Sequence, residues 1–226
     1  MREKTKEVIE FFKKHYKLVI IFVFLILFIE TMQEVFANEL MYRDIIGYKF
    51  ISKYLICDAI TPIAKFITWF GGVLGLIIVG IITTIIIRDK KIGICIWINL
   101  ATIGALNQIL KRIVQRPRPT EYRIIEESGY SFPSGHSMAS AAFYGFFIYL
   151  IFTKVKSKKV KTISITLLGL LIALIGISRI YLGVHYTSDV IAGFSISISY
   201  LTIFTSIAGD YIDKPNGESK ENKEEI

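Results

Sequence analysis

The sequence predicts an all-α integral membrane protein, a bundle of six transmembrane helices whose polar site lies at the extracytoplasmic face. First, 53% of the 226 residues are hydrophobic. They occur in blocks of about twenty, the length that crosses a bilayer. Second, the charged residues gather between these blocks. Third, three polar motifs lie beside blocks that end on the same predicted side of the membrane. This composition and patterning exclude an ordinary soluble domain.

The chain begins with a basic segment at residues 1–17, and the first apolar block follows at 18–36. A basic start before an apolar run is also typical of a secretory signal peptide. Because no small-residue cleavage site follows this run, we expect a retained membrane span.

The next stretch, residues 37–59, mixes apolar and charged side chains. Ile45, Phe50 and Tyr54 recur at near-helical spacing with Lys49 between them. This spacing predicts a helix lying in the extracytoplasmic interface of the membrane. An ordinary structured loop is the alternative.

Five further spans complete the predicted six-span domain, which covers residues 18–209. They are expected at 60–87, 92–110, 137–153, 163–180 and 190–208. Gly71 and Gly75 form a small-xxx-small face that lets helices approach closely, and we assign no chemistry to them. Residues 210–226 are expected to form a charged cytoplasmic tail.

Six spans place both termini on one side of the membrane. The termini and loops of that side hold 17 of the 27 Lys and Arg residues. By the positive-inside rule that side is cytoplasmic, so the three motifs face outward. In a chain this apolar, the net charge of +8 indicates contact with anionic membrane lipids, and we expect no nucleic-acid partner. Cys57 and Cys95 fall toward opposite faces, which argues against a disulfide between them.

The first motif, K-R-I-V-Q-R-P-R-P, covers residues 111–119. Its prolines end any helix and stiffen the backbone around Arg118. Lys111 supplies a mobile point charge and Arg118 a planar fork, and both suit phosphate oxygens. The alternative is that these cations only contact lipid headgroups.

The second motif, P-S-G-H, stands at residues 133–136, where the fourth span begins. Ser134 suits a helix N-cap, and Gly135 lets the backbone approach a ligand. The free N–H groups of the first helical turn favour an anion, and His136 leaves the same turn. The alternative is a capped helix with an interfacial histidine.

The third motif, S-R-I-Y-L-G-V-H-Y-T-S-D, covers residues 178–189 and places Arg179 at the outer end of the fifth span. His185 and Asp189 are four residues apart and share one face if the stretch is helical. A carboxylate beside an imidazole fixes its tautomer and leaves the other ring nitrogen free to attack or to accept a proton. The alternative is a helix-capping aspartate near a histidine.

The three motifs together predict nucleophilic phosphoryl transfer. His185 is the expected nucleophile, Asp189 orients it, and His136 is the expected general acid and base. The residues expected to hold the phosphate are Lys111, Arg118, Ser134, Gly135 and Arg179.

No metal and no cofactor are expected. Three fixed cations can neutralise the phosphoryl charge that Mg²⁺ neutralises in other enzymes. No carboxylate cluster suited to a metal lies near the motifs. Glu121, Glu126 and Glu127 are interpreted as solvated loop charges.

The motifs resemble the signature of the type 2 phosphatidic acid phosphatase superfamily: K-x-x-x-x-x-x-R-P, then P-S-G-H, then S-R-x-x-x-x-x-H-x-x-x-D. The chain matches all eleven fixed positions in order. The resemblance implies a six-helix core, a phosphohistidine at His185, and His136 as acid and base. It also implies a lipid phosphate or lipid pyrophosphate substrate. Bacterial members of this size include undecaprenyl pyrophosphate phosphatases and phosphatidylglycerophosphate phosphatases.

Two other classes of protein remain as alternatives. A transporter would use His185, Asp189 and Arg179 to line an ion path, although the spans are mostly aliphatic at mid-depth. A noncatalytic membrane protein would use the same cluster to bind anions, which leaves the gathering of all three motifs unexplained. The choice of lipid, the choice between monoester and pyrophosphate, and the oligomeric state stay open. Tyr122, Tyr130 and Phe132 are expected in an interfacial aromatic belt.

Overall fold

The computed structural model describes residues 2–37, 42–121 and 123–214, with side chains from residue 14 onward. All regular structure in these described ranges is helical. The helices are α1 (Arg2–Phe36), α2 (Tyr42–Tyr54), α3 (Ile60–Trp69), α4 (Val73–Ile87), α5 (Lys90–Val114), α6 (Gly135–Lys154), α7 (Lys158–Tyr181) and α8 (Thr187–Asp213). The all-α prediction is therefore confirmed. The predicted tail lies outside the described residues from residue 215, as does Tyr122.

Among the described helices, five are long and apolar enough to cross a membrane, namely α1 from Lys14, α5, α6, α7 and α8. Helices α3 and α4 meet at a 57° bend, and they make a sixth candidate span if the bent pair counts as one. The sequence predicted one continuous helix there, over residues 60–87. The bend brings the Trp69 carbonyl oxygen within 2.1 Å of where a Cβ on Gly75 would stand, so only glycine fits. Gly75 therefore permits the bend, whereas Gly71 packs against Ile175 of α7.

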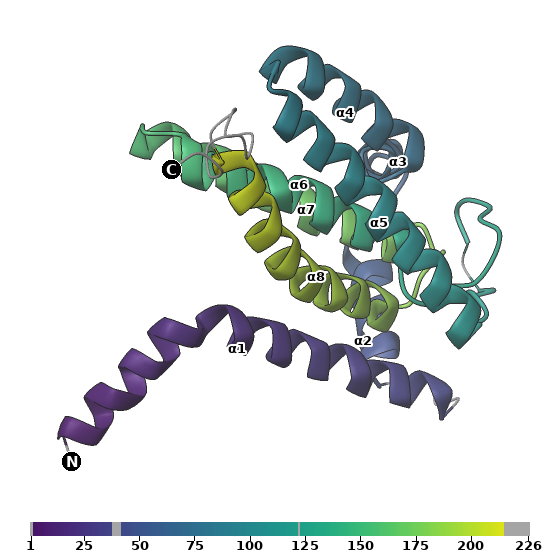
Figure 1. Ribbon diagram of the computed structural model, residues 1–226. Coiled ribbons are helices and arrows are strands. Elements are labelled where there is room, and N and C mark those ends of the chain that lie inside the picture. The colour runs from purple at the N-terminus through teal and green to yellow at the C-terminus, as the bar shows by residue number, and fades with distance from the viewer. Residues whose placement is uncertain (1, 38–41, 122, 215–226) are drawn as a thin grey trace, which may run out of the picture.

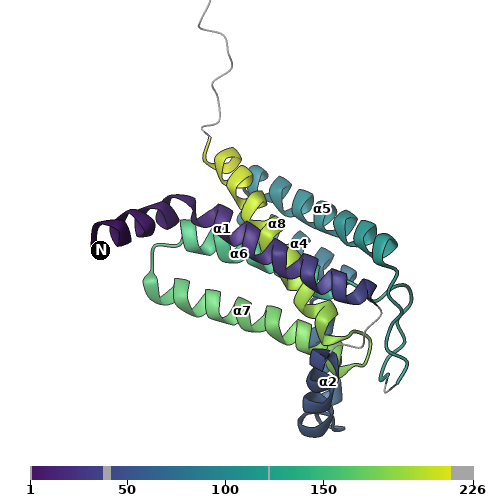
Figure 2. The same cartoon turned by 90° about the horizontal axis from the view of Figure 1, so that it is seen from below.

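Helix α6 lies at the centre of the bundle and contacts α5, α7 and α8 (Figures 1 and 2). It is the most buried of the candidate spans, and Phe143 and Phe146 anchor its apolar core. Helix α1 runs along α8, and its helical geometry breaks once, at His15. Much of the outer surface of α4 is aliphatic and exposed, as expected for a face in contact with lipid.

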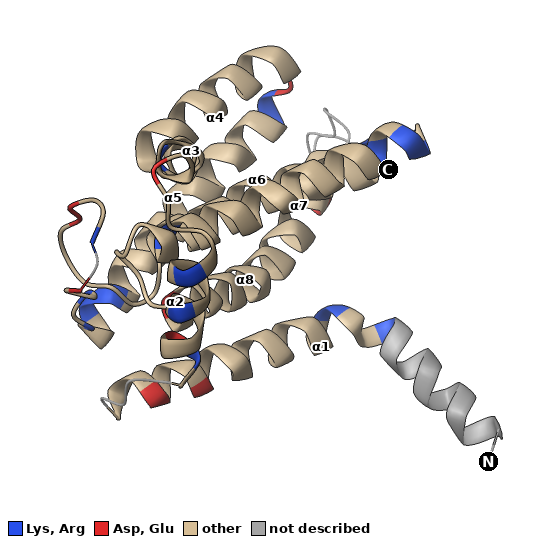
Figure 3. Ribbon diagram, turned by 180° about the vertical axis from the view of Figure 1, so that it is seen from behind, with Lys and Arg blue, Asp and Glu red and all other residues tan. Residues whose placement is uncertain are grey.

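The two ends of the bundle hold different groups of residues. At one end Lys91 bonds to Lys214, Lys154 pairs with Asp213, and Lys17 bonds to Ser206. Because neighbouring helices are antiparallel, four helix termini meet at the opposite end of the bundle. They are the C-termini of α5 and α7 and the N-termini of α6 and α8. In Figure 3 the ribbon of α2 and of the last turns of α5 is coloured for charged residues at this opposite end. The motifs meet there because each begins or ends one of these helices.

The predicted interfacial helix is present as α2, but it is more than a surface element. Asp44 and Ile51 are buried, and α2 packs against α7 and α8. Both cysteines are free: Cys57 is exposed in the α2–α3 loop, and Cys95 is buried in α5.

Candidate active site

His185 stands in the loop between α7 and α8, and Asp189 lies in the first turn of α8. The Asp189 side chain reaches back and accepts a hydrogen bond from the Tyr186 backbone N–H at 2.9 Å, which forms a capping box. The same carboxylate oxygen lies 3.3 Å from His185 Nδ1. The two residues meet through this cap, and not through a shared helix face as the spacing suggested.

The hydrogen bonds of His185 define its tautomer. Arg118 Nη1 lies 3.1 Å from His185 Nε2, and a guanidinium can only donate. Nε2 therefore carries the lone pair, and the ring proton sits on Nδ1 toward Asp189. Burial lowers the pKa of His185 to about 4, although Asp189 acts in the opposite direction. At neutral pH the ring is therefore uncharged and holds a lone pair on Nε2.

Arg116 secures Asp189 from the other side, a contact that the sequence did not predict. Its Nη1 donates to Asp189 Oδ1 at 2.7 Å, and its Nη2 donates to Asp44 Oδ2 at 2.9 Å. Both carboxylates and the guanidinium are buried. Against the lowering effect of burial, Asp189 and Asp44 raise the pKa of Arg116. Arg116 also stacks over the Tyr186 ring, 4.0 Å from its centroid.

Asp44 ties α2 to the start of α8. Its carboxylate accepts the Ser188 backbone N–H at 2.7 Å and the Ser188 hydroxyl at 2.9 Å. Ser131 adds a further hydrogen bond to Asp189. The sequence offered one sign of this network, since Asp44 is the single acidic residue in the apolar and basic segment that forms α2. No spacing rule, however, links Asp44 to Arg116.

Arg179 lies in the last turn of α7 and is 1% exposed. Its Nη1 donates to Thr68 Oγ1 at 2.9 Å, and its Nη2 pairs with Glu127. Its Nε is buried and has no hydrogen-bond partner among the described residues. The interpretation of Glu127 as a solvated loop charge was wrong, because its carboxylate turns inward to Arg179. Glu126 is 92% exposed and fits that interpretation.

Arg118 organises the loop between α5 and α6. It donates to the carbonyl oxygens of Ser128 and Gly129 at 3.0 Å, and to that of Val184 at 2.9 Å. Lys111 Nζ donates to the Tyr130 carbonyl oxygen at 2.8 Å, so it closes the same loop from α5. Arg118 of the first motif therefore lies beside Val184 and His185 of the third motif.

The second motif forms the start of α6. Ser134 is the N-cap, fully buried, and its Oγ accepts a hydrogen bond from Ser137. A Cβ on Gly135 would stand 3.0 Å from Asn107 Oδ1, so the glycine packs closely against Asn107. His136 faces the α3–α4 bend, where a Cβ on Gly72 would lie 3.4 Å from its Nε2. His136 interacts electrostatically with His185 and Arg179.

Two other features bear on the aromatic and metal predictions. Phe132 is fully buried against Phe28, so it does not belong to an interfacial belt, whereas Tyr130 is exposed.

Within the described residues, no group of three or more His, Cys, Asp or Glu side chains is arranged to hold a metal ion.

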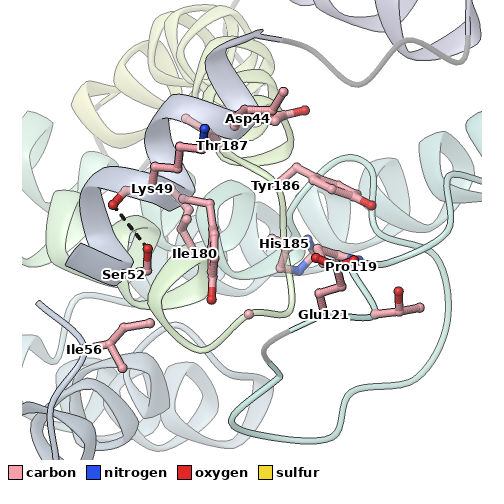
Figure 4. A pocket seen from close by; sticks show the side chains of 14 residues that line it. Asp44, Lys49, Ser52, Ile56, Pro119, Glu121, Ile180, His185, Tyr186 and Thr187 are labelled. Carbon is pink, nitrogen blue, oxygen red and sulfur yellow. Dashed lines mark hydrogen bonds between the residues drawn. The ribbon is translucent and has the colours of Figure 1, made fainter.

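A cavity of about 790 Å³ lies on the α2 side of His185. Lys49 and Ser52 of α2 line it together with His185 and Tyr186 (Figure 4). Of the eight predicted site residues, all of which are described, only His185 lines this cavity.

Comparison with known proteins agrees with the motifs. The chain is 39% identical to phosphatidylglycerophosphatase B of Bacillus subtilis over 108 residues, which cover 47% of this chain and 53% of that protein. It is 30% identical to undecaprenyl-diphosphatase of Sulfolobus acidocaldarius over 125 residues, 51% of this chain and 56% of that one. The chain thus spans about half the length of these curated relatives.

The fold also matches a solved structure, the crystal structure of a transmembrane PAP2 type phosphatidylglycerolphosphate phosphatase from Bacillus subtilis. The TM-score is 0.69 at 26% identity, over 87% of this chain and 97% of that chain. The PAP2 superfamily model matches residues 92–213, which hold all three motifs. With this match over more than half of its length, and with a multi-pass helical fold of the same kind, the chain belongs to the PAP2 superfamily.

Proposed function

We propose that the chain is an integral-membrane lipid phosphatase that acts through a phosphohistidine intermediate. The proposed substrate is undecaprenyl pyrophosphate or phosphatidylglycerophosphate, in line with the names of similar proteins. The observation that carries the proposal is Arg179. A guanidinium has five N–H groups, and described protein atoms accept two of those of Arg179. A buried cation with unpaired donors beside a neutral histidine suits a phosphoryl group.

In the first step, the lone pair of His185 Nε2 forms a bond to phosphorus. The bond from phosphorus to the leaving oxygen breaks, and His136 gives that oxygen a proton. Asp189 accepts the Nδ1–H of His185 throughout, which stabilises the positive charge that develops on the ring. In the second step, water attacks phosphorus and gives a proton to His136. The phosphorus–nitrogen bond breaks, and the electron pair returns to Nε2.

The surrounding cations hold the phosphoryl oxygens during both steps. Arg179 lies on α7, Lys111 on α5 and Arg118 in the loop between α5 and α6, and Arg118 lies against Nε2 of His185. The backbone N–H of Gly135, in the first turn of α6, adds the positive end of a helix dipole. Because these groups are fixed before substrate arrives, they stabilise developing charge without reorganising.

The test is phosphate release by detergent-purified protein in EDTA, with undecaprenyl pyrophosphate, phosphatidylglycerophosphate and phosphatidic acid compared at equal surface concentration. We expect metal-independent release, and the ranking of the three lipids identifies the substrate class. If none of the lipids releases phosphate, the phosphatase proposal fails, and the anion-binding alternatives, a transporter or a noncatalytic protein, take its place.

We further propose that this site faces the extracytoplasmic side and that both termini are cytoplasmic, which the positive-inside rule supports. Cys57 offers a test, because it is exposed and its backbone N–H and carbonyl oxygen bond the Tyr181 hydroxyl at the site end of α7. We expect a membrane-impermeant maleimide to label Cys57 in intact cells. Cys57→Ser should abolish the labelling, since Cys95 is buried. Labelling that requires permeabilised cells would place the site on the cytoplasmic side.

A further inference from the structure

We propose that Glu127 is an internal anion that occupies the phosphate-binding position between Arg118 and Arg179, and that the phosphate of the substrate displaces it. This inference rests on the proposed phosphatase function and adds a residue that the signature motifs do not contain. Glu127 lies in the loop between α5 and α6, next to the exposed Glu126.

The position of the carboxylate is the first argument. One oxygen of Glu127 pairs with Arg179 Nη2, and the other lies 4.0 Å from Arg118 Nη2. Both arginines are buried, whereas the Glu127 side chain is 31% exposed. The side chain therefore reaches from the molecular surface to the point between two buried guanidinium groups.

The donors that remain on the two arginines are the second argument. Four hydrogen bonds occupy Arg118, three to carbonyl oxygens and one to His185. Since a guanidinium has five N–H groups, one is left, on the Nη2 that lies near Glu127. Carboxylate and phosphate groups both bind a guanidinium through two of their oxygens. A phosphate that used Arg118 and Arg179 together would thus meet the donors that Glu127 already engages.

Charge is the third argument. Although burial acts in the opposite direction, Arg179 and Arg118 lower the pKa of Glu127, so the carboxylate is ionised at neutral pH. A carboxylate left in place would repel a phosphate oxygen bound to the same arginines. Because the side chain is partly exposed, rotation of its own torsions can carry it to solvent. Ser128 and Gly129 can meanwhile keep their bonds to Arg118.

The experiment measures the affinity of the protein for inorganic phosphate and orthovanadate by titration calorimetry in detergent, which needs no turnover. The variants are Glu127→Gln and Glu127→Ala, with Glu126→Gln as the matched control in the same loop. We expect both Glu127 variants to bind each anion about tenfold more tightly, the effect of removing one competing charged hydrogen bond. In steady-state assays, KM should fall while kcat changes less. Glu126→Gln should match the wild type.

The opposite result has a distinct meaning. If Glu127 instead holds Arg179 in position for catalysis, both variants will bind the anions more weakly and kcat will fall, which overturns the proposal. Equal affinity in all four proteins also overturns it, while leaving the phosphatase function standing. If the wild type and its variants neither bind the anions nor release phosphate, the proposed function itself fails.

Discussion

Replacing His185 with alanine is expected to reduce phosphate release by at least about 10³-fold, because it removes the atom that forms the bond to phosphorus. The neutral ring is buried between Arg118 and Asp189 and holds its lone pair on Nε2. The measurement is single-turnover phosphate release from the best lipid of the panel. Wild-type protein quenched during turnover should also carry a phosphoryl label that is lost in acid and retained in alkali.

The control for this result is His15→Ala, which removes a histidine of α1 far from the motif-bearing end of the bundle. His185→Gln, which keeps more of the buried volume, and the thermal unfolding of each variant distinguish lost chemistry from lost folding. Undiminished release by a folded His185 variant would show that another group is the nucleophile. An acid-labile phosphoryl label on that variant would also show that another group is the nucleophile.

Replacing Arg116 with alanine is expected to destabilise the protein by about 3–5 kcal/mol, the usual cost of breaking a buried ion pair. Arg116 is the cation between Asp44 and Asp189, and its loss leaves two buried carboxylates facing one another. The unfolding temperature in detergent should fall by on the order of 10 °C. Phosphate release should fall as well, because Asp189 loses the contact that fixes its position beside His185.

Arg112→Ala is the matched control, since Arg112 is an exposed arginine in the last turn of α5. Its unfolding temperature should stay within about 2 °C of the wild type, as surface substitutions do. Adding Asp44→Asn to Arg116→Ala removes one of the two stranded charges and should recover part of the stability. A stable Arg116→Ala protein would mean that water or another group already neutralises Asp44 and Asp189.

The sequence was sufficient for features that depend on local pattern and on helix order. The apolar blocks predict the spans, because length and composition alone decide whether a helix can cross a bilayer. Alternation of direction then brings the three motifs to one end, where the structure places His185 beside Arg118. Ser134 was predicted as an N-cap from its position before a helix, and it is one.

Tertiary structure alone decided the contacts that join distant segments. Asp44 and Arg116 are 72 positions apart, and nothing in either segment specifies the other. Glu127 has the same local sequence signal as the exposed Glu126, yet packing turns it toward Arg179. The α3–α4 bend was likewise invisible, since Gly75 suits a straight helix as well as a bent one. Local sequence pattern determines which helices form, whereas the pairing of buried charges depends on how the helices and loops pack together in the tertiary structure.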